Sequence, residues 1–182
     1  MEGKSSCLAG PRTMLPLTHI DARDTEMTIE TLAARFQKSK GQPIQLGSDT
    51  VCAMYQMPIS AGGHVLRILR ASAKANPVQG LRLKIGGGEL LINGQILSDI
   101  VLWADNSPKE VAVSISATKD TVLKIWNVWS IGGAMNAWIG NAGMLVAETD
   151  DNIWLRCSDG IGDVDFSDLV VSVDLHSDVG SI

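Results

Sequence analysis

The chain has 182 residues and a mass of 19.4 kDa, which is enough for one domain with a short extension. With 45% hydrophobic and 19% charged residues, it is not collagen-like, of low complexity or disordered throughout. A net charge of −5 argues against nucleic acid as a partner, because nucleic-acid-binding domains are usually basic.

The first 26 residues show no sustained hydrophobic period, and we interpret residues 1–26 as a flexible leader. This leader lacks the continuous apolar stretch of a secretory signal, and no apolar run reaches the ~18 residues of a transmembrane helix. An odd number of cysteines argues against a disulfide framework: Cys7, Cys52 and Cys157. We therefore expect a cytoplasmic protein, and leave an unusual route of export open as an alternative.

Residues 27–43 predict a helix and a linker. Thr28 can cap a helix over 28–38, and Gly41 and Pro43 end the pattern. Apolar residues recur at the spacing of one helical face: Ile29, Leu32, Ala33 and Phe36. We expect this face to pack on a sheet or on a partner.

Residues 44–177 predict a single β-domain, followed by a tail at 178–182. Short apolar or alternating segments are separated by turn signals: 64–70, 81–85, 89–92, 95–98, 111–117, 121–129, 138–139, 144–146, 153–157 and 169–175. Asn93-Gly94 between two apolar runs predicts a tight hairpin with a type I′ turn. Since no strand–helix–strand alternation occurs, we predict an all-β fold, an antiparallel β-sandwich or jelly roll with one short N-terminal helix.

Acidic residues are concentrated at the C-terminal end. Residues 148–182 hold nine of the chain's 20 acidic side chains and one base, Arg156. This asymmetry calls for cations, a basic partner surface, or the chain's own basic half. Four aspartates within ten residues repel one another unless a cation neutralises them: Asp159, Asp163, Asp165 and Asp168. We predict a calcium site there; the alternative is a solvated acidic turn in which Asp165 or Asp168 accepts loop hydrogen bonds.

The segment from Asp163 to Val170 also carries a resemblance. Its D-V-D-F-S-D-L-V sequence is similar to the segment that leads into the last strand of some bacterial calcium-associated β-sandwich (jelly-roll) binding modules. The similarity covers about sixteen of the 182 residues. It implies that Asp163, Asp165 and Asp168 face the ion and that Phe166 fills the core.

The five tryptophans all fall within 52 residues. Trp126 and Trp129 lie three apart on a predicted strand and therefore point to opposite faces, so we expect one in the core and the other exposed or at an edge. A glycine- and asparagine-rich loop follows. Indole rings and amides together suit a sugar or a protein surface, and we predict these ligand-binding residues: Trp126, Asn127, Trp129, Asn136, Trp138 and Asn141.

These patterns favour a non-enzymatic binding module, stabilised by calcium, that recognises a carbohydrate or a protein surface. A first alternative is an oligomerising structural protein in which the helix at 28–38 or an exposed edge strand contacts a second copy. A second alternative is a hydrolase that uses Cys157 with His64 and an aspartate, provided the fold brings them together.

Overall fold

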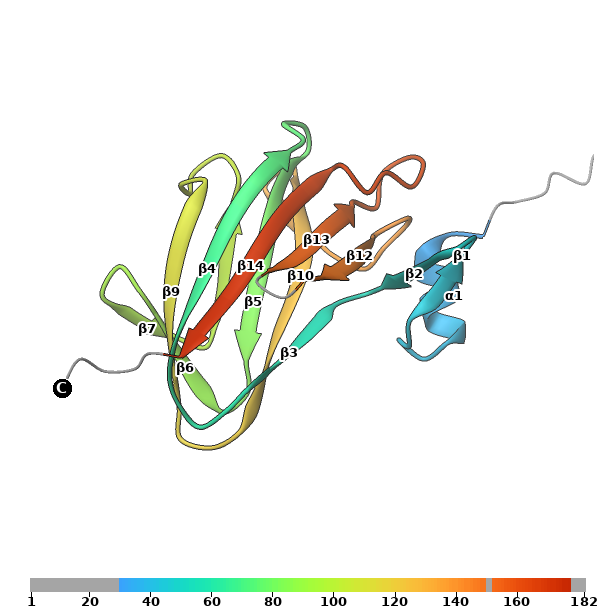
Figure 1. Cartoon of the computed structure of the whole chain (residues 1–182). Helices are drawn as coiled ribbons and strands as arrows, with labels where there is room; N and C mark the ends of the chain where they lie inside the picture. Colours follow the sequence, from blue (N-terminus) through green and yellow to red (C-terminus); the bar gives the residue numbers. More distant parts are fainter. Residues whose placement is uncertain (1–29, 150–151, 178–182) are drawn as a thin grey trace, which may run out of the picture.

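The computed structural model describes residues 30–149 and 152–177. Two antiparallel sheets pack face to face, and a small unit with the helix lies at one end of the larger sheet (Figure 1). The predicted all-β antiparallel sandwich with one short helix is confirmed for this part of the chain.

The larger sheet has nine strands, and the smaller has four strands in sequence along it with a fifth, β3, that pairs with β10. In spatial order, the larger sheet consists of β1 (Ile44–Leu46), β2 (Asp49–Cys52), β12 (Gly143–Glu148), β13 (Ile153–Ser158), β14 (Leu169–Ser177), β4 (Gly62–Ala73), β9 (Glu110–Ala117), β6 (Gly88–Ile92) and β7 (Gln95–Leu97). The smaller sheet consists of β11 (Ala134–Asn136), β10 (Thr121–Ile131), β5 (Val78–Ile85) and β8 (Asp99–Trp103), with β3 (Tyr55–Ile59) beside β10.

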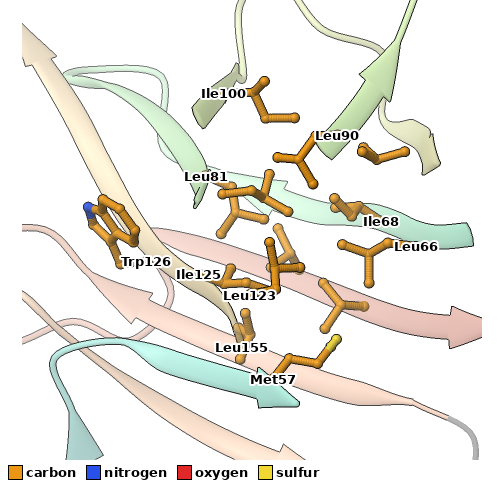
Figure 2. Close-up of a cluster of buried hydrophobic side chains, with 14 of the residues drawn as sticks. Met57, Leu66, Ile68, Leu81, Leu90, Ile100, Leu123, Ile125, Trp126 and Leu155 are labelled. Carbon is orange, nitrogen blue, oxygen red and sulfur yellow. The ribbon is translucent and has the colours of Figure 1, made fainter. Parts of the chain in front are cut away.

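The main core lies between the two sheets. Alternate residues of each strand point inward, so the aliphatic side chains that the sequence alternates with polar ones meet in one cluster. Leu66, Leu83 and Leu123 are fully buried there. Figure 2 shows Trp126 at the margin of this aliphatic cluster.

Helix α1 (Leu32–Lys38) has its own small core on β1 and β2. It begins later than the sequence predicts, at Leu32, because Thr31 is its N-cap and accepts a hydrogen bond from the Ala34 N–H. Residues 28 and 29 lie outside the described residues. Leu32 and Phe36 are buried against Ile44 and Val51, so the predicted apolar face packs on a sheet.

The hairpin of β6 and β7 has the predicted turn. Asn93 and Gly94 have φ angles of 50° and 74°, which are the two left-handed positions of a type I′ turn. Within the described residues, no helix has the length and apolar character needed to cross a bilayer.

Candidate binding groove around Trp138

Trp138 lies in the loop between β11 and β12. The predicted strand at 138–139 is wrong, because Trp138 has a φ of 57°, a left-handed conformation that a strand cannot contain. Its indole N–H donates a hydrogen bond of 3.2 Å to the Ala53 carbonyl, and its side chain is still 47% exposed. Trp138 is therefore fixed in place while half of its surface remains accessible.

The Trp126 ring, on strand β10, packs against the Trp138 ring. The two rings stack with centroids 5.2 Å apart and planes inclined by 28°. The Arg82 guanidinium lies 5.2 Å from the Trp126 ring centroid and binds Asp99 through two hydrogen bonds of 2.8 and 2.7 Å. Those hydrogen bonds from Arg82 lower the pKa of the Asp99 carboxyl, and Asp99 in turn raises the pKa of Arg82.

The expectation that one tryptophan of the 126/129 pair is exposed is wrong. Trp129 points into the sandwich and is 0% exposed. Trp126 is on the opposite face of β10, as the spacing predicts, but the Trp138 ring covers it and leaves 3% exposed. Neither ring therefore presents a surface to a ligand in this structure.

Two of the three predicted asparagines serve the fold. The Asn127 amide is buried and donates to the Ser158 carbonyl. Asn141 accepts from the Leu32 N–H at the start of α1 and donates to the Gly162 carbonyl. Asn136 is partly exposed, and its amide donates to the Ala134 carbonyl two residues earlier. Of the six predicted ligand-binding residues, Trp138 is exposed and Asn136 and Asn141 are partly exposed, while the other three are buried.

The loop that carries Trp138 packs tightly on the acidic loop. A Cβ atom on Gly140 would collide with the carbonyl oxygen of Gly160, and a Cβ on Gly160 would lie 2.6 Å from the Trp129 ring. Asn141 adds a hydrogen bond of 2.7 Å to Gly162. The Trp138 loop and the acidic loop, which are separate candidates in the sequence, thus pack against each other in the structure.

A groove of about 460 Å³ lies beside Trp138, between helix α1 and the segment that leads into β3. Most of its lining side chains are apolar or uncharged, and Lys40 is the cation among them. The lining residues are Ala33, Phe36, Gln37, Lys40, Gly41, Ala53, Met54, Gln56 and Trp138. A ligand in this groove could contact the Trp138 ring, the flexible Met54 side chain and the amides of Gln37 and Gln56.

The acidic loop is neutralised in part by a lysine. Asp159 is 0% exposed and Asp168 4%, and the Lys74 ammonium lies 3.2 Å from a carboxylate oxygen of each. The Gln79 amide donates to the same Asp159 oxygen as Lys74, and the backbone N–H groups of Ile161 and Asp159 donate to the other oxygens of Asp159 and Asp168. These carboxylates and hydrogen bonds raise the pKa of Lys74 against the opposing effect of its desolvation, so the lysine stays charged. The chain's own basic half thus supplies a cation for this cluster.

Asp163 and Asp165 are exposed, unlike Asp159 and Asp168. Asp165 accepts from the hydroxyl and backbone N–H of Ser167, which lowers the pKa of its carboxyl. No group of three metal-ligating side chains gathers among the described residues. Phe166 packs against the small core of α1 and not in the main core. The loop hydrogen bonds of the alternative interpretation are present, and calcium binding stays a prediction.

The residues considered for hydrolysis are not brought together. Cys157 is opposite Leu169 at one end of β14, and His64 is opposite Ser177 at the other end, roughly 25 Å away at strand spacing. Burial raises the pKa of Cys157 to about 12, so its thiol stays protonated. The His64 Nε2 is within 2.9 Å of the Ser60 carbonyl oxygen.

The sequence did not predict the groove residues Gln37 and Gln56, nor the two partners of the predicted Asp159, which are Lys74 and Gln79. Gln37 and Gln56 are ordinary exposed residues in sequence, and only the docking of α1 places them beside Trp138. The sequence does contain an indication for Gln79. It alternates in phase with Leu81 and Leu83, whose side chains point into the core, so it is a polar residue at a core position. No feature of the local sequence indicates that Lys74 binds the same Asp159 carboxylate as Gln79.

The chain matches no protein-family model, and neither curated proteins nor solved structures give a significant match. The functional assignment therefore depends on the geometry of the site.

Proposed function

We propose that the chain is a non-enzymatic recognition module that binds a segment of a partner protein in the groove beside Trp138. The observation that carries the proposal is the position of this one residue. Trp138 is backed by Trp126 and fixed through its indole N–H to Ala53, yet its side chain is 47% exposed. A rigid, half-exposed tryptophan offers a large contact area at little entropic cost, and Trp is enriched at binding hot spots.

The surroundings of Trp138 favour a protein segment as the ligand. Ile139 and Ile161 are 53% and 42% exposed, in the two loops that pack together at Gly140 and Gly160, and they extend the apolar surface beyond the groove. Aromatic residues and Met are enriched at interface cores, whereas acidic residues are depleted. Among the described residues that line the groove, none has a carboxylate. We therefore expect a segment with apolar anchors and an acidic residue that faces Lys40.

A neutral sugar is the second candidate. The Gln37 and Gln56 amides line the same groove as the Trp138 ring. A sugar ring can stack on an indole face while its hydroxyl groups bond to amides. This candidate uses the same residues, so one set of variants tests both.

The test compares ligand selection by the wild-type chain and by Trp138→Ala. A random peptide library and a glycan array are each screened against both proteins, and the affinities of the selected ligands are measured by calorimetry. We expect peptides with apolar anchors whose binding weakens at least about tenfold in Trp138→Ala, a loss of about 1.4 kcal/mol. Trp154→Ala is the matched control, because Trp154 is a partly buried tryptophan on β13 and lies outside the groove lining.

The outcomes separate the two candidates. Glycans whose binding depends on Trp138, together with no selected peptides, would replace the protein ligand by a sugar. Ligands that bind Trp138→Ala as well as they bind the wild type, or that lose affinity only in Trp154→Ala, would contradict the proposed groove.

A further inference from the structure

Strand β7 is an exposed edge of the nine-stranded sheet. It is the last strand in the spatial order and pairs with β6 alone. All three of its residues are exposed, and Ile96 in the middle is 63% exposed. Figure 1 shows the hairpin of β6 and β7 at the end of the molecule opposite to α1. An edge strand of this kind offers backbone groups to a further strand.

The hairpin register shows which backbone groups are available. Ile92 and Gln95 flank the two-residue turn, and in such a hairpin this closing pair exchanges both hydrogen bonds. The pairs alternate along an antiparallel ladder, so the next pair, Leu91 and Ile96, does not exchange them. The N–H and C=O of Ile96 therefore point away from β6, toward the open edge.

Nothing in this edge repels a second strand. From Leu90 to Ser98 the chain has no charged residue and no proline, although charges and prolines are the usual protection of an edge. The other edge strand of the same sheet, β1, is covered. There the Arg35 guanidinium donates to the Gln45 carbonyl of β1, and helix α1 packs on that strand.

The side chains of the hairpin are also apolar on its outer face. Leu91 and Ile96 are cross-strand partners, and they are 44% and 63% exposed. On the inner side, Leu97 is 39% exposed and lines a groove of about 590 Å³ beside Val101 and Leu102. A strand added at β7 would continue both rows of apolar side chains and cover part of them.

We infer that a second copy of this chain pairs with this edge, β7 against β7, about a two-fold axis at Ile96. In a two-fold antiparallel pair, the residue on the axis faces its own copy, so a charge there would meet a like charge. Ile96 is uncharged, and so are its neighbours on β7. Ile96 of each copy then exchanges both backbone hydrogen bonds with Ile96 of the other. Gln95 of each copy is opposite Leu97 of the other, which places that leucine at the mouth of the groove lined by Ile92.

The test is the mass of the full chain in solution, measured by sedimentation velocity and native mass spectrometry over a range of concentrations. We expect the wild type to pass from 19.4 kDa to twice that mass as its concentration rises. Ile96→Pro removes an N–H that makes no bond to β6, and Ile96→Lys places like charges at the axis. We expect both variants to remain monomeric.

Leu69→Lys is the control. Leu69 is 45% exposed on β4, an interior strand of the same sheet, so its substitution leaves an edge-to-edge dimer intact. Circular dichroism and thermal melting confirm that each variant is folded. A wild type that stays at 19.4 kDa at every concentration, a dimer that survives in both Ile96 variants, or a dimer lost only in Leu69→Lys would each overturn the inference. Since β7 is remote from Trp138, this result is independent of the proposed ligand.

Discussion

The indole rings of Trp126 and Trp138 stack with their centroids 5.2 Å apart, although the two residues belong to a strand and to a loop. This contact buries Trp126 on the outer face of its sheet and holds Trp138 at the surface. The same pair therefore links the stability of the sandwich to the shape of the groove.

The packing of the Trp138 loop on the acidic loop predicts an unusually costly glycine substitution. Gly140→Ala combines a positive φ of 57° with a collision at the Gly160 carbonyl. We expect a loss of about 3 kcal/mol in the free energy of unfolding, measured by urea denaturation.

Gly133→Ala is its matched control, because Gly133 has a φ of 81° and no other atom within 4 Å of its Cβ position. We expect this control to lose only about 1–2 kcal/mol, the cost of the backbone conformation. Equal losses in the two variants would mean that the loops are not in contact.

The Lys74 cluster predicts a second stability difference. Lys74→Met leaves the buried carboxylates of Asp159 and Asp168 without their cation. We expect a loss of about 2–3 kcal/mol, less than for a fully enclosed pair because the lysine side chain is 34% exposed. Lys109→Met, at an exposed position with no ion pair among the described residues, should change stability by no more than about 0.5 kcal/mol. Similar values for both variants would refute a structural role of Lys74.

Much of the fold follows from local patterns, and so does the choice of Trp138, but the other residues of the groove do not. The hairpin at Asn93-Gly94 and the buried face of Leu32 and Phe36 depend on residues close in sequence, so turn chemistry and periodicity predict them. The buried state of Trp126 depends on a ring twelve residues later that folds back over the outer face.

The cation of the acidic loop is harder still to predict. Lys74 and Asp159 are 85 residues apart, and they meet because β4 and β13, the strands that precede them, both pair with β14. Charge counting indicated that some cation was needed there. It could not choose between a metal ion, a partner and a lysine of the same chain, because that choice depends on the tertiary structure.

The pair of Arg82 and Asp99 predicts a contribution to stability that depends on pH. Because the folded-state pKa of Asp99 is lowered, the pair stabilises the fold above about pH 4, the range of a free carboxyl. This contribution is lost as the pH falls through the lower folded pKa. We expect Asp99→Asn to cost about 0.5–1 kcal/mol at pH 7 and less at pH 3, by chemical denaturation at both values. A cost that is the same at both pH values would argue against the ion pair.

Calcium is tested by thermal unfolding after treatment with EDTA, with and without about 1 mM calcium, and with magnesium as the control. Lys74 neutralises Asp159 and Asp168 only in part, so the calcium site stays a prediction, and an unchanged melting temperature would contradict it. A rise of several degrees that is specific to calcium and absent in Asp165→Asn would instead confirm the site predicted from the sequence.

Trp138 and its groove form the proposed binding surface, and NMR titration of the labelled chain tests this proposal most directly. The indole N–H signals of Trp138 and Trp154 are assigned by their loss in the two alanine variants. On addition of a selected ligand, we predict that the Trp138 signal shifts together with the side-chain amides of Gln37 and Gln56, while Trp154 is unchanged. Shifts at Trp154 and the outer face of the large sheet, with Trp138 unmoved, would contradict the account.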